Sequence, residues 1–121
     1  MGVYVSVRGW LECDEVQLAA VQEIISSHAD DHYSNGWSAP RQQVNWTRYV
    51  FYGADLRESA LDWLMIQIRE IARIPASDDD GDRIRGLFLA SHEVDGSTEW
   101  QVRDGQLVVS PADTGHRYLD E

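Results

Sequence analysis

The chain has 121 residues, of which 43% are hydrophobic, so it is long enough to bury a core and is most simply one domain spanning residues 1–121. Its 21 acidic and 10 basic residues give a formal net charge of −11, which disfavours binding to nucleic acids and to anionic membranes. A basic protein partner would be attracted by this charge, although simple solubility would also account for it.

The location of the protein is suggested by three further features of the sequence. No apolar run approaches the roughly 20 residues that cross a bilayer. No basic segment followed by an apolar one resembles a secretory leader. The single cysteine, Cys13, cannot form an internal disulfide and fits a reducing compartment. We therefore expect a cytoplasmic protein.

The chain begins with a predicted strand and helix. Val3, Val5, Val7 and Leu11 alternate with polar residues, which predicts a strand with one face towards the core. Gly9 inside this strand predicts a bulge, or a place where Trp10 needs room. Asp14 and Gln17 are three residues apart and form the pattern of a capping box. The helix that they start is expected to run to about Ser27.

Residues 28–43 are polar and rich in turn-forming residues, which is unusual for a connection of this length without a function. Asp30 and Asp31 lie close to Tyr33 and Trp37 in this segment. Aromatic side chains among acidic ones are typical of a protein-binding surface. The alternative is that Trp37 folds back onto the core.

The next segment predicts a buried strand at residues 46–52, ended by Gly53. Asp55 and Glu58 suggest a second capping box at the start of a helix that stops before Pro75. The apolar side chains of this helix recur at helical spacing, so we expect it to lie at the centre of the core. They are Leu61, Leu64, Met65, Ile68, Ile71 and Ala72.

The last third predicts an antiparallel meander. An acidic loop carrying Asp78, Asp79, Asp80 and Asp82 precedes strands at residues 84–94, 98–103 and 106–110. The strands are separated by Asp-Gly pairs at residues 95–96 and 104–105, which are strong hairpin signals. A polar tail follows at residues 111–121, with Tyr118 and Leu119 expected to hold it. The order β-α-β-α-β-β-β predicts an α+β two-layer sandwich, with two helices on a mostly antiparallel sheet of about five strands.

Two groups of residues are candidates for a metal site. His28 and His32 are four residues apart and could share a metal on a continuing helix, but the helix is expected to fray there. The acidic loop around Gly81 resembles a calcium loop, yet Ala76 and Leu87 occupy essential ligand positions. We therefore predict no metal site and no cofactor.

The other candidates for catalysis are equally weak. Acidic neighbours should raise the pKa of Cys13, which predicts a structural thiol. Glu93 and Glu99 could face each other across the last turns, but two carboxylates without a cleft do not make an acid–base site. Trp10, Trp46, Trp63 and Trp100 are predicted to lie in the core or at its edge, with the alternative that some of them are interface anchors. No nucleophile or phosphate-binding motif is present.

The order of elements and a set of short motifs resemble one family of proteins. The motifs are Gly9-Trp10, Gly86-Leu87-Phe88-Leu89, Glu99-Trp100-Gln101-Val102 followed by Asp104-Gly105-Gln106-Leu107, and Tyr118-Leu119. Together the layout is similar to a family of small acidic α+β immunity proteins of bacterial polymorphic-toxin and contact-dependent inhibition systems. The resemblance implies a cytoplasmic, non-enzymatic protein that binds and neutralises a cognate toxin.

Charge and aromatic content then suggest how such a toxin would be bound. The partner is expected to be basic, and acidic side chains would occlude its substrate-binding lysines or arginines while aromatic ones anchor the contact. The predicted partner-binding residues are Asp30, Asp31, Tyr33, Trp37, Asp78, Asp79, Asp80 and Asp82. One alternative is a small-ligand-binding or metal-binding domain or an enzyme, using His28, His32, His92 or Glu93. A third is a general acidic mimic of nucleic acid.

Overall fold

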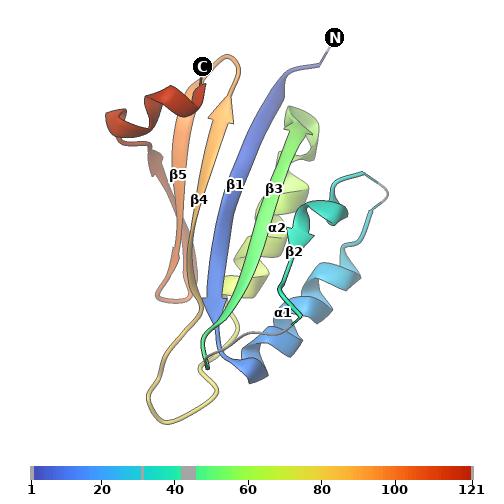
Figure 1. Ribbon diagram of the computed structural model, residues 1–121, viewed down its shortest axis with the longest axis vertical. Helices are drawn as coiled ribbons and strands as arrows, with labels where there is room; N and C mark the ends of the chain where they lie inside the picture. Colours follow the sequence, from blue (N-terminus) through green and yellow to red (C-terminus); the bar gives the residue numbers. More distant parts are fainter. Residues whose placement is uncertain (1, 31, 42–45, 121) are drawn as a thin grey trace.

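The computed structural model describes residues 2–30, 32–41 and 46–120, and it is an α+β fold with one six-stranded antiparallel sheet (Figure 1). The strands are β1 (Tyr4–Cys13), β2 (Trp37–Ser38), β3 (Arg48–Arg57), β4 (Arg85–His92), β5 (Gly96–Arg103) and β6 (Gln106–Pro111). The helices are α1 (Glu15–Ser27) and α2 (Leu61–Ala72), with short 3-10 helices η1 (Ser34–Gly36), η2 (Glu58–Ala60) and η3 (Thr114–Asp120). Short β2 is the strand that the sequence did not predict.

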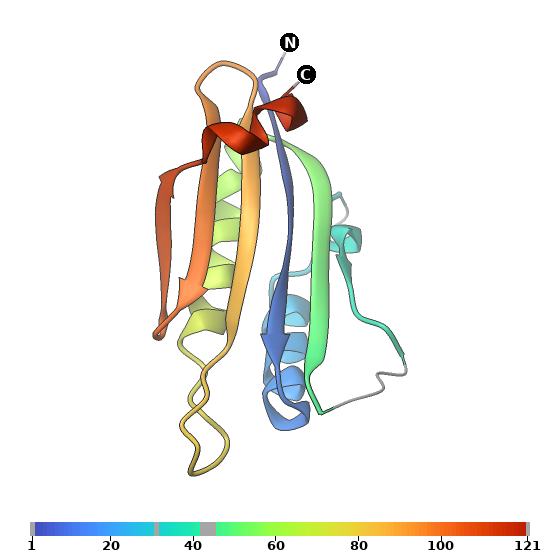
Figure 2. The same cartoon turned by 60° about the vertical axis from the view of Figure 1, so that its left-hand side comes forward.

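The sheet is built around β1, and its strand order is β2-β3-β1-β4-β5-β6. β1 pairs along its whole length with β3, from Tyr4 opposite Arg57 to Cys13 opposite Arg48. On its other side it pairs with β4, from Val5 opposite His92 to Glu12 opposite Arg85. Both α-helices lie on one face of this sheet (Figure 2), so the two-layer arrangement is confirmed. No described helix is both long enough and apolar enough to cross a membrane.

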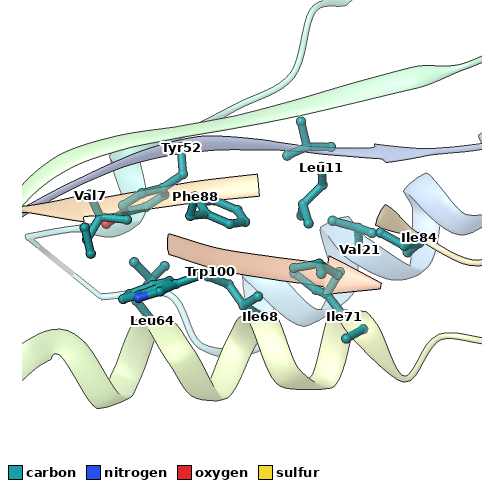
Figure 3. Close-up of a cluster of buried hydrophobic side chains, with 14 of the residues drawn as sticks. Val7, Leu11, Val21, Tyr52, Leu64, Ile68, Ile71, Ile84, Phe88 and Trp100 are labelled. Carbon is teal, nitrogen blue, oxygen red and sulfur yellow. The ribbon is translucent and has the colours of Figure 1, made fainter. Parts of the chain in front are cut away.

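The core fills the space between the sheet and the helices (Figure 3). On α2, the side chains of Leu64, Ile68 and Ile71 are completely buried, which confirms that this helix lies at the centre of the core. They meet inward-facing strand residues, including Phe88 of β4 and Trp100 of β5. Burial of this apolar surface is the main favourable contribution to folding.

Helix α1 begins as predicted. The Asp14 carboxylate accepts a hydrogen bond from the backbone N–H of Gln17 at 2.8 Å, and the Gln17 side-chain oxygen accepts one from the N–H of Asp14 at 3.0 Å. The Gln17 amide nitrogen also donates to the carbonyls of Pro75 and Asp82 at 3.3 and 3.0 Å. The start of α1 is therefore fastened to the acidic loop.

The predicted boundary between β3 and α2 was wrong. β3 continues through Gly53 to Arg57, because the equally long β1 provides a partner for every residue. Asp55 therefore lies within the strand, where its carboxylate accepts a hydrogen bond from the Ser6 hydroxyl at 2.6 Å. α2 begins only at Leu61, after η2, and has no side-chain cap.

The prediction of a bulge at Gly9 was also wrong, because β1 pairs regularly there. A Cβ on Gly9 would lie 2.1 Å from the Leu87 carbonyl oxygen and 2.6 Å from the Phe88 Cα. Gly9 therefore makes room for β4 rather than for Trp10. The two hairpin turns are confirmed, with positive φ at Gly96 (83°) and Gly105 (78°).

The C-terminal segment crosses the face of the sheet opposite the helices (Figure 2). It is held by its backbone and by Asp120: Arg8 donates to the Leu119 carbonyl at 3.4 Å, and Ser97 donates to the Asp120 carboxylate. Tyr118, expected to hold the tail, is 66% exposed. η3 contains no buried residue, so it covers this face only lightly.

Candidate protein-binding site

A hollow of about 440 Å³ lies at the end of the molecule where β1 passes into α1. Its walls come from this junction, from the loop after α2 and from the chain just before β3. Five carboxylate residues and two arginines line it, and we call it the acidic hollow. Its residues are Glu12, Cys13, Asp14, Gln17, Trp46, Thr47, Asp78, Asp80, Asp82, Arg83 and Arg85.

The acidic loop is held in place by the start of α1. Besides the two hydrogen bonds from Gln17, the Ser77 hydroxyl donates to the Asp14 carboxylate. Within the loop, the Asp78 carboxylate accepts from the backbone N–H of Asp80 at 3.1 Å, and Gly81 adopts a positive φ of 73°. These contacts hold the loop aspartates at the rim of the acidic hollow.

The two arginines only partly offset the negative charge of the acidic hollow. Arg85 pairs with Glu12 at 3.3 Å. The Arg83 guanidinium lies against Gly105, since a Cβ there would be 1.9 Å from its Nη1. In the part of the chain that the structure describes, no ion pair involves Asp78, Asp80 or Asp82. The loop therefore presents uncompensated negative charge to solvent.

Trp46 lies at the rim of the acidic hollow and is 84% exposed. The prediction that it lies in the core or at its edge was wrong, because β3 starts only at Arg48 and Trp46 lies before that strand. Sequence reasoning also missed Glu12 and Asp14 as members of the site. Their position could have indicated this, since both residues adjoin the predicted junction of the first strand and the first helix.

The other predicted acidic segment lies at the opposite end of α1, so the structure does not bring the two together. The Asp30 carboxylate accepts hydrogen bonds from the backbone N–H groups of Tyr33 at 2.7 Å and Ser34 at 2.9 Å. Burial raises the pKa of Asp30, but the backbone donors of Tyr33, Ser34 and His32 outweigh it, so the pKa lies below its ordinary value. Asp31 lies outside the described residues.

The aromatic residues of that segment pack against the core, which for Trp37 is the alternative interpretation given above. The Tyr33 carbonyl accepts a hydrogen bond from the Tyr52 hydroxyl at 3.0 Å. The ring of Trp37 lies edge-on to Tyr52, with centroids 4.8 Å apart, and near Phe88. Both side chains are half-buried, which leaves them less surface for a partner than Trp46 has.

Two of the histidines considered for metal binding or catalysis, His28 and His92, have other partners. α1 ends at Ser27, and His28 pairs with Glu70 at 3.1 Å. His92 instead contacts Glu58 and accepts two backbone N–H groups of its own turn. Within residues 2–30, 32–41 and 46–120, no three His, Cys, Asp or Glu side chains are grouped as metal ligands would be.

The two remaining candidates for catalysis have structural partners. Glu93 accepts a hydrogen bond from the N–H of Tyr4, and Glu99 accepts one from the Gln101 side chain. Glu99 is opposite Leu89 in the register of β4 and β5, so it is not paired with Glu93 across the hairpin. Cys13 is buried, and burial, followed by the charge of Asp14, raises the pKa of its thiol to about 11. The prediction of an unreactive, structural Cys13 is thereby supported.

Comparison with known proteins provides no relative for this chain. No protein-family model matches it, and neither a curated protein nor a solved structure matches it significantly. What the acidic hollow can bind must be argued from its own residues.

Proposed function

We propose that this chain is an immunity protein, which binds a cognate bacterial toxin and neutralises it by occluding the toxin's active or substrate-binding surface. The observation that carries the proposal is the acidic hollow, where five carboxylates stand against two arginines and Trp46 is exposed at the rim. The order of elements and the short motifs that resemble the immunity family support the same function.

The mechanism is occlusion of a basic surface. Lysines or arginines with which the toxin would hold a negatively charged substrate enter the acidic hollow instead, and Trp46 packs against the toxin as an anchor. The net charge of −11 accelerates encounter with a basic partner by long-range attraction. No catalytic residue or cofactor is needed, and the protein would act in the cytoplasm, where a free Cys13 stays reduced.

The test compares two charge-reversal variants that change the net charge equally. The first, Asp80→Lys with Asp82→Lys, alters the rim of the acidic hollow. The second, Glu23→Lys with Asp62→Lys, alters exposed positions on α1 and α2. Association with purified, inactivated toxin-like domains encoded beside the gene is measured by stopped-flow at low salt. We expect the rim variant to associate at least about tenfold more slowly than the control variant.

Salt provides the internal check. Screening at about 1 M salt, where the Debye length is about 3 Å, should bring the association rates of all three proteins together. Equal slowing by the two variants would show that only total charge matters and would rule out the acidic hollow. The absence of any high-affinity partner among those domains would refute the immunity function itself.

A further inference from the structure

The face of the sheet that points away from the helices carries apolar residues where polar ones are the rule. In a two-layer fold, alternate strand residues on the solvated face are normally polar. Here the middle of that face carries Phe51 of β3, Trp10 of β1 and Leu87 of β4 in one row, since Trp10 is opposite both of the others in the register. Phe51 is 44% exposed.

A fourth residue, Tyr49, extends this row towards the acidic hollow. Its ring stacks on that of Phe51, with centroids 6.2 Å apart and planes at 12°, and Tyr49 is 40% exposed. We call Tyr49, Phe51, Trp10 and Leu87 the aromatic band. The C-terminal η3 contacts β4 and β5 and crosses this face near the end of the sheet where the chain starts (Figure 2). Within the aromatic band, Tyr49 and Phe51 are exposed, and Trp10 and Leu87 are half-buried.

Trp10, at the middle of the aromatic band, is held in place by hydrogen bonding. The indole N–H of Trp10 donates to Glu12 at 2.9 Å, and the same carboxylate pairs with Arg85 at 3.3 Å. Side chains that are already ordered lose less conformational entropy on binding. Rigid aromatic side chains of this kind are common among the residues that dominate the energy of protein interfaces.

The aromatic band and the acidic hollow form one continuous surface. Glu12 and Arg85 line the acidic hollow, and on the open face Glu12 lies opposite both Tyr49 and Arg85. Along β1 the surface therefore passes from Trp10 to the rim of the acidic hollow at Glu12 within two residues, roughly 7 Å at the usual rise per residue. A partner that covers both parts must have an apolar area flanked by basic side chains.

We infer that the toxin's interface extends from the acidic hollow onto the aromatic band, so that its basic residues enter the acidic hollow while an adjoining apolar area covers Phe51, Trp10 and Leu87. This inference rests on the proposed function and adds a second part to the same site. The two parts have different roles: the acidic hollow sets the rate of encounter, and the aromatic band sets how long the complex lasts.

A second copy of the chain is the competing occupant, and charge argues against it. Two copies joined through the aromatic band would each carry a net charge of −11. Like charges placed across an interface disfavour association. A basic partner relieves this repulsion, whereas a homodimer increases it.

The test separates the two parts of the site kinetically, using the toxin domain that binds in the preceding experiment as the probe. Phe51→Ser is compared with Val109→Ser, because Val109 is 45% exposed but lies on the face that carries the helices. Phe51→Ser should raise the dissociation rate at least about tenfold with less than about a twofold change in association rate. Val109→Ser should change neither, and Asp80→Lys with Asp82→Lys should show the opposite pattern.

A second measurement uses the unaltered protein, so it does not depend on a variant that folds. Hydroxyl-radical footprinting of the complex should show protection of Trp10, Tyr49 and Phe51. Unchanged dissociation of Phe51→Ser together with no protection would overturn this inference and leave the immunity function standing. Dimerisation of the free protein at micromolar concentration, abolished by Phe51→Ser in sedimentation experiments, would also overturn it. Failure of every toxin domain to bind would remove both proposals.

Discussion

Asp14 and Asp55 each stand three residues before a side chain that could complete a capping box, yet only Asp14 caps a helix. The difference comes from what precedes them. β1 ends at Cys13, so Asp14 has no strand partner and its carboxylate can cap α1, whereas Asp55 is still paired with Ser6 across the sheet. A local pattern therefore fails where strand pairing competes for the same residues.

This contrast predicts different effects on stability. Asp14→Ala removes a side-chain acceptor from the first turn of α1 and a contact to Ser77, and it should lower the free energy of unfolding by about 1 kcal/mol or more. Asp55→Ala loses only an exposed hydrogen bond to Ser6 and should cost less than about 1 kcal/mol. Urea unfolding of the two variants measures the difference. A larger loss for Asp55→Ala would show that the predicted second cap exists in solution.

At the level of elements, the strands of the C-terminal meander could be predicted because each turn carries its own signal. Asp104 and Gly105 both adopt the positive φ that a tight two-residue hairpin requires. The extent of β3 could not be predicted, because it depends on the length of β1, which is distant in sequence. The acidic hollow was foreseen only as an acidic loop, since its other wall forms when the end of β1 packs beside that loop.

Two glycines in neighbouring strands test how closely the elements pack. Gly9 of β1 has the backbone of β4 against it, whereas no atom lies within 4 Å of where a Cβ on Gly53 of β3 would stand. Gly9→Ala should therefore lower the free energy of unfolding by about 2 kcal/mol through overpacking. Gly53→Ala should be neutral, or stabilising by up to about 1 kcal/mol, because alanine loses less backbone entropy in a strand.

Thermal or urea unfolding provides both values. Since each variant makes the same chemical change in the interior of a strand, general effects of replacing glycine cancel in the comparison. Equal free energies of unfolding for Gly9→Ala and Gly53→Ala would mean that β1 and β4 lie further apart than they do in this structure.

Across the whole molecule, all ten basic residues are arginines and the chain contains no lysine. There are no lysines to titrate, and arginine stays charged far above neutral pH, so the basic residues do not complicate alkaline unfolding. Burial, and then the negative charge of Asp14, raises the pKa of Cys13 from 9.0 to about 11. Burial also raises the pKa of Tyr52 above its ordinary value of 10.0.

The sign of the resulting pH dependence follows from linkage. A pKa that is higher in the folded state means that the folded protein holds the proton more tightly, so this contribution to stability is complete below pH 9 and is lost as the pH rises towards about 11. In Cys13→Ala the free energy of unfolding should fall less between pH 8.5 and about 10 than in the unaltered protein, because the loss from the Cys13 thiol is removed and only that from Tyr52 begins near pH 10. Chemical unfolding at several pH values tests this. If the free energy of unfolding fell equally steeply with pH in Cys13→Ala and in the unaltered protein, the Cys13 thiol would be solvated in the folded state.

The central place of β1 in the sheet also determines the order in which the protein can fold. β1 is synthesised first, but one of its two partner strands, β4, begins only at Arg85, after both α-helices. Until β4 leaves the ribosome, one edge of β1 has no partner within the chain, and an open strand edge is where chains pair wrongly with each other. Completion of the sheet is therefore a late, long-range step, and nascent chains that end before Arg85 are the species that most need protection from aggregation.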